Sequence, residues 1–398
     1  MVGSFFVCGI AFLLAAAVAG LIQAIAPWSW GSWLALHLAF VGGISQLVLG
    51  ASQFFVGAFL ATDPPPRRLV RGELLLWNLG AVGLAVAVPT NAGGGIWIAV
   101  GCLVVALGLW TASIAVMWRR SLRRSVWAIA WYCSGALFLG FGVIAGSLLA
   151  HGLPWSHGDL LGAHMSLNLA GWFGGAIVGT LHTFYPSLTQ TQLRYPGLQG
   201  LTFGAWTGGV VALAVGYGWG LDPLAIVGWI TLCLGALGLL ANLAACLRDA
   251  NGPLSLAARV VGAAQPFLLA ALLVATISAI GSGPEQSLTG MSRAAVGTLL
   301  VAGWIGLTVL GSLLHLLAVV IRVRGGFAAA MPVPRPRLDS GVVALAMVAI
   351  TALALAQGVG LDGLHNPARL LLLAVYGVLG ARVAQLAARV VARARPSI

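Results

Sequence analysis

The stretch AHMSLNLAGWFGGAIVGTLHTFYPSL, residues 163–188, is predicted to cross a lipid bilayer, yet it contains two histidines. His164 lies near its beginning and His182 near its end, with several glycines between them. Ionisable side chains are costly in hydrocarbon, so a histidine in such a segment predicts a functional site. Glycines leave the helix surface smooth, which lets another backbone or a flat ligand approach closely. The stretch therefore predicts a membrane-spanning helix that carries ligands.

The whole chain has the composition of a multi-pass membrane protein. Of its 398 residues, 60% are hydrophobic and only 7% are charged, and its mean hydropathy is +1.02. A soluble protein carries about a quarter charged residues, so this class is excluded. The net charge of +12 does not indicate nucleic-acid binding, because all 20 basic residues are arginines and most of them cluster in the short gaps between apolar runs. The composition predicts that the chain's main partner is the lipid bilayer.

Twelve apolar runs, separated by breaks that mostly contain proline, predict an all-α protein with twelve transmembrane helices. The runs cover residues 5–26, 32–61, 69–89, 95–118, 125–150, 159–186, 198–219, 223–247, 255–281, 293–321, 341–358 and 366–390. Eighteen arginines fall on one side of these runs, and only Arg293 and Arg369 fall on the other. Because cytoplasmic loops are enriched in arginine, both termini are predicted to be cytoplasmic.

Three of the even-numbered runs share a glycine pattern that predicts an internal repeat. The matches are Gly42 with Gly50 in the second run, Ala170-Gly171-Trp172 with Gly179-Thr180-Leu181 in the sixth, and Ala302-Gly303-Trp304 with Gly311-Ser312-Leu313 in the tenth. The first glycines are 129 and 132 residues apart, which is about a third of the chain. Three four-helix units follow, at approximately 1–122, 123–252 and 253–398, within a single membrane domain. Coincidence is the alternative, since the chain holds 55 glycines and 15 tryptophans.

Two histidines are predicted to lie at the same depth on the outer side of the membrane. His37 and His164 both fall in the first third of runs that cross in the same direction. Two neutral imidazoles from facing helices can bind a haem iron axially. Gly42 and Gly171 would then let the porphyrin lie close to the helix walls. The alternative is that each imidazole only forms a hydrogen bond with a neighbouring helix.

The remaining histidines form weaker candidates for metal binding. His182 and His315 lie near the inner ends of their runs, where they would form a second metal site or simply cap a helix end. His151, His157 and Asp159 fall in a predicted outer loop, which would bind copper or zinc or would be an ordinary solvated loop.

Other polar and aromatic residues are predicted to have structural roles. Glu73 lies close to arginines at the cytoplasmic edge and is interpreted as a partner of those charges rather than as part of a proton relay. Tryptophans near the ends of the runs are typical of the interfacial belt of membrane proteins; they are Trp28, Trp30, Trp33, Trp155 and Trp219.

The histidine-containing runs resemble two helices of the haem–copper oxidase subunit I superfamily, including its cbb-type and nitric-oxide-reductase branches and the related NnrS family. Residues 163–188 look like the helix that carries the His-x-His haem ligands, with His164 on the first histidine and Ser166 in place of the second. The stretch LHLAFVGGISQLVLGASQFF, residues 36–55, is similar to the second helix, whose early histidine binds a low-spin haem and corresponds to His37.

This resemblance implies a pseudo-threefold arrangement of the three four-helix units and a low-spin haem b between His37 and His164. It also implies copper as a second metal, a redox, nitric-oxide-related or oxidase-associated role, and a location in the bacterial cytoplasmic (inner) membrane. A redox partner or other membrane subunits would be the protein partners.

The chain also departs from the family, because it has no His-His pair and no complete His-x-His motif. The catalytic copper site is therefore incomplete, and whether the chain is an enzyme is left open. Two other classes remain as alternatives: a copper transporter or permease, and a scaffold subunit without cofactors.

Overall fold

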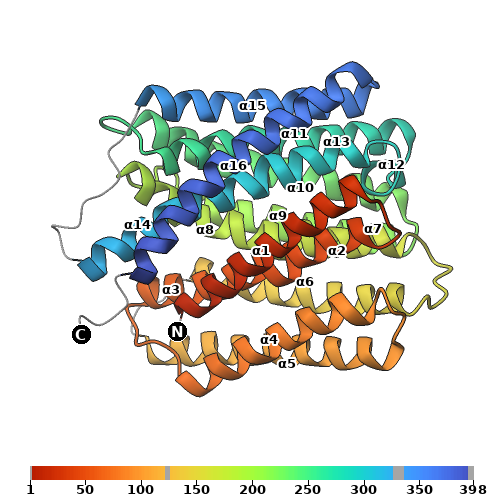
Figure 1. The fold of residues 1–398 in the computed structure, drawn as a ribbon, viewed down its shortest axis with the longest axis horizontal. Helices are drawn as coiled ribbons and strands as arrows, with labels where there is room; N and C mark the ends of the chain where they lie inside the picture. The colour runs from red at the N-terminus through yellow and green to blue at the C-terminus, as the bar shows by residue number, and fades with distance from the viewer. Residues whose placement is uncertain (1, 122–125, 326–335, 393–398) are drawn as a thin grey trace. The chain divides into compact units, whose positions relative to one another are not determined.

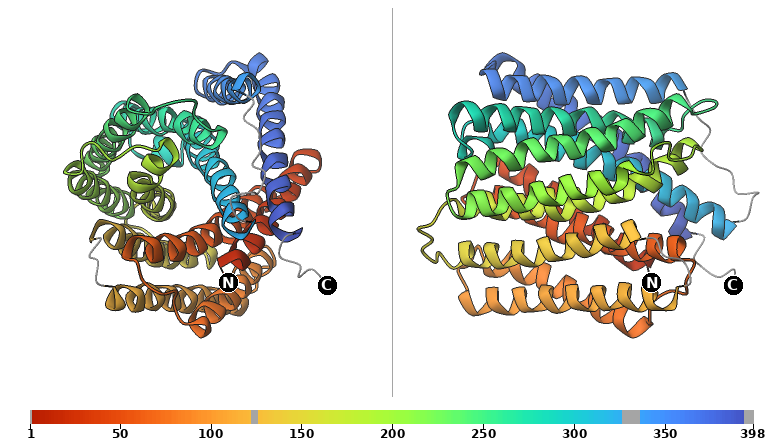
Figure 2. Two further views of the ribbon diagram at one scale, coloured as in Figure 1. Left: turned by 90° about the vertical axis from the view of Figure 1, so that its left-hand side faces the viewer. Right: turned by 180° about the vertical axis from the view of Figure 1, so that it is seen from behind.

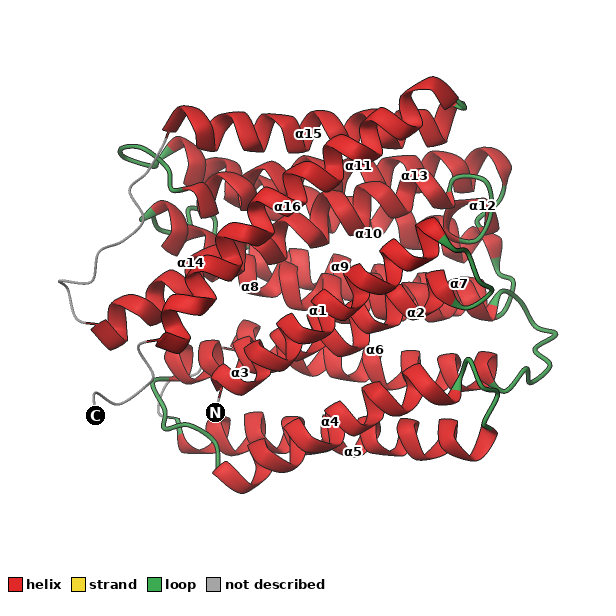
Figure 3. Ribbon diagram, in the orientation of Figure 1, coloured by secondary structure: helices red, strands yellow, loops and turns green. Residues whose placement is uncertain are grey.

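The computed structural model describes residues 2–121, 126–325 and 336–392, and within these ranges every element is helical (Figure 3). The predicted all-helical fold is confirmed for this part of the chain. Several arginines that entered the topology prediction lie outside the described residues; they are Arg123, Arg124, Arg335, Arg393 and Arg395.

Eleven of the described helices are long and apolar enough to cross a membrane, so the chain is a multi-pass membrane protein. The sixth predicted run is also helical, from Leu160 to Thr189, but it is not among the eleven. This helix contains His164, Ser166 and Asn168 within five residues, and these polar side chains lower its affinity for hydrocarbon. The count of twelve therefore stays a prediction.

The chain divides into two compact units, Met1–Gly179 and Thr180–Ile398. The first unit contains α1 (Val2–Ile25), α2 (Gly31–His37), η1 (Leu38–Ile44), α3 (Ser45–Leu60), α4 (Arg67–Ala87), α5 (Gly93–Arg120), α6 (Val126–Ala150), α7 (Leu160–Met165) and η2 (Ser166–Gly174). Helix α8 (Gly175–Thr189) contains the boundary. In Figure 1, α2 and α7 begin at the same end of the first unit and run in the same direction.

The second unit contains α9 (Leu198–Gly218), α10 (Asp222–Arg248), α11 (Leu256–Ser282), α12 (Glu285–Leu288), α13 (Arg293–Gly297), η3 (Thr298–Gly306), α14 (Leu307–Gly325), α15 (Pro336–Val359) and α16 (Asp362–Ala392). Helices α9 and α10 lie side by side, as do α15 and α16 (Figure 2). The division into two units is not the predicted division into three repeats, which stays a prediction.

Local sequence explains where several helices begin. Asp159 caps α7, because its carboxylate accepts a hydrogen bond of 2.8 Å from the Gly162 amide. Ser255 caps α11 in the same way, accepting from the Ala258 amide at 3.2 Å. Both residue types are strong N-caps, and both precede apolar runs in the sequence. The capping role of Asp159 also gives this carboxylate a structural partner.

Three π-helical segments interrupt the second, sixth and tenth predicted runs. They are η1, η2 and η3, and each contains the first glycine of the shared pattern, namely Gly42, Gly171 or Gly303. A π-helical turn contains more residues than an α-helical turn, and such segments are frequent at functional sites. The three segments therefore turn the side chains that precede them away from the positions an α-helix would give.

The same three glycines allow close packing against an aromatic ring. A Cβ atom added at Gly171 would lie 2.6 Å from Phe138 Cβ, and one added at Gly303 would lie 2.6 Å from Phe267 Cβ. A Cβ at Gly42 would meet the ring of Phe12 in the same manner. At Gly171 and Gly303 the nearest atom is a phenylalanine Cβ, which is fixed to the backbone, so a larger residue there would force the helices to shift.

Candidate functional site

His37 is the last residue of α2, and its ring is held by the preceding turn. Its Nδ1 lies 2.9 Å from the carbonyl oxygen of Trp33, and its ring stacks on the Trp33 indole with 4.0 Å between centroids. A carbonyl oxygen can only accept, so Nδ1 carries the proton in this contact. Nε2 of the neutral ring then presents a lone pair.

His164 in α7 is held by the neighbouring helix α6. Its Nδ1 lies 2.8 Å from the carbonyl oxygen of Gly142, which again fixes the proton on Nδ1. A Cβ atom at Gly146, one turn further along α6, would lie 2.8 Å from His164 Cε1. Gly146 therefore lies directly against the imidazole, and Gly142 accepts its hydrogen bond.

Asn168, four residues after His164, forms a hydrogen bond back to the His164 backbone. Its Nδ2 donates to the backbone oxygen of His164 at 2.7 Å. The second contact of Nδ2, at 3.3 Å from His164 Nδ1, is not a hydrogen bond in the tautomer set by Gly142, because both atoms are then donors.

Both imidazoles are half-buried, and within the residues that the structure describes Nε2 of neither ring forms a hydrogen bond. A histidine that ligates a metal usually donates its other ring N–H to a backbone carbonyl or carboxylate, which fixes the tautomer and the ring orientation. His37 and His164 both have this arrangement. Each one presents a ligating nitrogen that the protein has not used.

The two histidines lie at corresponding positions of their helices. Trp172 Nε1 donates to Ser45 Oγ at 3.0 Å and joins η2 to the start of α3. His37 precedes Ser45 by eight residues, and His164 precedes Trp172 by eight residues. The two helices run in the same direction (Figure 1), so His37 and His164 stand at corresponding positions along them.

Two neutral imidazoles whose Nε2 is available are donors of the kind that a haem iron takes as axial ligands, and haem binding by this pair stays a prediction. Gly42 and Gly171, predicted to lie beside the porphyrin, have their Cα atoms packed against Phe12 and Phe138. The structure gives these two glycines a role in helix packing, and their role beside a porphyrin stays a prediction.

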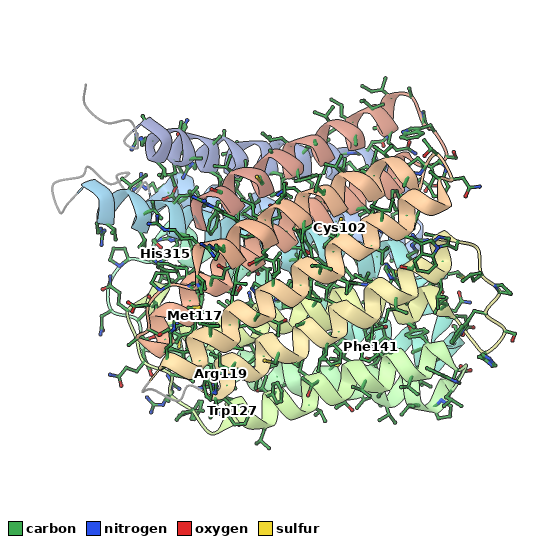
Figure 4. The ribbon with its side chains drawn as sticks, turned by 90° about the horizontal axis from the view of Figure 1, so that it is seen from below. Cys102, Met117, Arg119, Trp127, Phe141 and His315 are labelled. Atoms are coloured by element: carbon green, nitrogen blue, oxygen red, sulfur yellow. The ribbon has the colours of Figure 1, made fainter. Side chains whose placement is uncertain are left out.

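The second predicted pair, His182 and His315, lies in the second unit. His182 is buried in α8, and the ring of His315 on α14 meets Phe184 edge to face, with 5.4 Å between centroids. Figure 4 labels His315 on α14. Among the described residues no cluster of three or more His, Cys, Asp or Glu side chains could hold a metal ion. Metal binding by this pair stays a prediction.

In the predicted outer-loop site, His151 and Asp159 contact backbone atoms. His151 has Nδ1 at 2.8 Å from the Ser147 carbonyl oxygen and Nε2 at 3.3 Å from that of Gly93, so both ring nitrogens face backbone acceptors. Asp159 is the cap of α7. These contacts favour the ordinary structural interpretation of the loop over metal binding.

The interpretation of Glu73 as a partner of arginines is wrong. Its side chain is fully buried, and both carboxyl oxygens contact Nε2 of Gln53, at 3.0 and 2.9 Å. Arg67, Arg68 and Arg71 on the same helix are exposed. The rotation of α4 about its axis turns Glu73 toward α3 and the arginines outward.

Sequence reasoning missed the residues that hold the two imidazoles: Trp33, Gly142, Gly146 and Asn168. The sequence predicts an interfacial position for Trp33, whereas in the structure its ring and its carbonyl both contact His37. Gly142 and Gly146 form a Gly-x-x-x-Gly motif, which marks a surface for close helix contact and was a readable signal. The placement of Asn168 depends on η2 and carried no such signal.

Comparison with known proteins assigns no family: no protein-family model matches the chain, and no curated protein matches its sequence. The resemblance to the haem–copper oxidase subunit I superfamily rests on the residues quoted for it.

Proposed function

We propose that this chain is a haem-binding membrane protein similar to subunit I of the haem–copper oxidases, with His37 and His164 as the axial ligands of a low-spin haem b. The observation that carries the proposal is the shared state of the two rings. In both, Nδ1 donates a hydrogen bond to a backbone carbonyl oxygen and Nε2 forms no hydrogen bond within the described residues, on helices that run in the same direction (Figure 1).

A haem b held by two imidazoles supplies one-electron transfer. The protein's own residues orient and insulate the ligands. Trp33 covers one face of the His37 ring, and Gly146 of α6 lies directly against His164. With such a haem the protein would take part in electron transfer, in nitric-oxide-related redox chemistry, or in an oxidase-associated role.

The proposal includes twelve transmembrane helices with both termini in the cytoplasm of a bacterium, the sixth being Leu160–Thr189. It also includes three four-helix repeats in a pseudo-threefold arrangement. Support for the repeats comes from η1, η2 and η3, which interrupt corresponding helices, and from the matching Gly–Phe contacts in each.

The test is a reduced-minus-oxidised visible spectrum of the protein purified in detergent after expression with ample haem. The wild-type chain should show the sharp alpha band of a low-spin haem b. The variants His37→Ala and His164→Ala should each lose it, because one axial ligand is not enough to hold the iron in a low-spin state. His157→Ala serves as the control and should retain the full band.

Absence of haem from well-folded wild-type protein would overturn the proposal. Metal analysis of the same sample would then distinguish a copper transporter or permease from a scaffold subunit without cofactors. Bound copper that is lost in His182→Ala, His315→Ala double variants would favour a copper transporter, and a metal-free protein would favour a scaffold subunit.

A further inference from the structure

Glu73 lies in the first unit in surroundings that do not suit a carboxylate anion. Its side chain is fully buried, and its partner Gln53 is 3% exposed. Among the residues that the structure describes, no cation forms an ion pair with Glu73, and Gln53 Nε2 is its one hydrogen-bond donor. A buried anion without a compensating charge is strongly destabilising, particularly in a membrane.

Gln53 supplies a second, independent observation. Its Oε1 is buried and has no hydrogen-bond partner in the described part of the chain. An ionised Glu73 has no proton to offer this oxygen. In the structure Gln53 Nε2 faces both carboxyl oxygens of Glu73. Once the Gln53 amide turns, the O–H group of a protonated Glu73 can donate to Oε1 while its carbonyl oxygen accepts from Nε2.

The same two helices show this kind of pairing a short distance away. Gln46 Nε2 donates to Asn78 Oδ1 at 3.2 Å, and Asn78 Nδ2 donates to Gln46 Oε1 at 3.3 Å. The two amides form a closed ring with two hydrogen bonds between α3 and α4. A carboxylic acid presents one donor and one acceptor side by side, as an amide does, so Glu73 and Gln53 can form the corresponding ring only when Glu73 carries a proton.

We infer that Glu73 and Gln53 form a proton-binding site inside the membrane, in which Glu73 is a neutral carboxylic acid whose proton exchanges with the solvent. Glu73 lies six residues after Arg67, where α4 begins, which is about 9 Å along the helix. Glu73 would therefore exchange its proton with the solvent at the end of α4 that carries Arg67. This inference does not depend on the presence of haem.

The chain allows an unusually direct test, because it contains only two glutamates, Glu73 and Glu285. Glu285 is exposed and serves as an internal reference. The full chain is made by cell-free synthesis with glutamate labelled with ¹³C at the side-chain carboxyl and with unlabelled glutamine. Infrared spectra are recorded at neutral pH in H₂O and in D₂O, with sodium-free and sodium-containing buffers.

The expected result is one labelled carboxylic-acid band from Glu73 and one labelled carboxylate band from Glu285. The acid band should shift in D₂O and should be completely absent from Glu73→Gln, whereas Glu285→Gln should lose only the carboxylate band. Glu285→Gln alone also assigns the acid band to Glu73, because Glu73 is then the one labelled residue. The test therefore still works if Glu73→Gln folds poorly.

Two carboxylate bands in the wild-type chain would overturn the inference. So would an acid band that persists in Glu73→Gln or that does not shift in D₂O. Conversion of the acid band to a carboxylate band on addition of sodium would also overturn it, because the pair would then be a cation site.

Discussion

His164 has little room for its ring to move, since a single glycine on α6 lies directly beside it. We expect Gly146→Ala to displace the imidazole, because the new Cβ would lie 2.8 Å from His164 Cε1. The Nδ1 contact with Gly142 should weaken, and the proposed low-spin band should fall or change shape while the protein stays folded. The reduced-minus-oxidised spectrum measures this.

The matched control is Gly140→Ala on the same helix, where an added Cβ meets nothing within 4 Å. This variant should retain the wild-type spectrum. An unchanged spectrum in Gly146→Ala would show that the contact between Gly146 and the His164 ring does not set the position of the imidazole.

Gly303 and its contact with Phe267 make a second prediction at this scale. Gly303→Ala should destabilise the protein by about 1–3 kcal/mol, because the new methyl group overlaps a ring held by packed helices. Thermal unfolding in detergent measures the change. Gly204→Ala on α9, with open space around the glycine, should be neutral or slightly stabilising. Equal effects of the two substitutions would contradict the close contact.

Single residues also mark where sequence reasoning fails. The histidines His37 and His164 were identifiable, because an ionisable group in an apolar run is conspicuous. The pairing of Glu73 with Gln53 was not, because it depends on how far α4 is rotated about its axis relative to α3. Neighbouring arginines in the sequence suggested the opposite orientation.

At the scale of the helices, two tryptophans occupy corresponding places in η2 and η3. Trp172 Nε1 donates to Ser45 Oγ at 3.0 Å, and Trp304 Nε1 donates to Gln265 Oε1 at 3.1 Å. Each indole is fully buried. Trp172→Phe and Trp304→Phe should each lower the free energy of unfolding by about 1–3 kcal/mol, since a buried acceptor loses its donor.

A double-mutant cycle of Trp172→Phe with Ser45→Ala separates the hydrogen bond from the packing of the ring. Coupling of about 0.5–1.5 kcal/mol is expected between the two sites. Additive effects would show that the contact contributes nothing to stability.

The helices themselves were largely predictable. Their ends follow proline and capping residues such as Asp159 and Ser255, and the observed bounds fall within a few residues of most predicted runs. The segments η1, η2 and η3 were not predictable, because extra residues in a helical turn leave no signal in composition or apolar periodicity. They decide which side chains face one another, so the geometry around His164 could not be derived from the sequence.

For the whole molecule, the testable property is its orientation in the membrane. A green fluorescent protein fused to the C-terminus should fluoresce, because that end is predicted to be cytoplasmic. Alkaline phosphatase inserted between α6 and α7 should be active, because the segment 151–159 is predicted to lie outside. The two reporters are measured in cells that express the full chain.

Exchanging the two reporters is the control, and both signals should then disappear. An active phosphatase at the C-terminus, with segment 151–159 still outside, would mean an even number of crossings after that segment instead of the predicted odd number. The helix Leu160–Thr189 would then be the first candidate for a segment that does not cross.

The π-helical segments bear on the history of the chain. A π-turn holds one residue more than an α-turn, which is what the insertion of one residue into an α-helix would produce. If the three four-helix units descend from one ancestral unit, the simplest explanation of η1, η2 and η3 is that the insertion occurred once, before the ancestral gene was copied. The distorted turn would then be older than the three-part molecule, and any present role of the histidines was acquired around a bend that already existed.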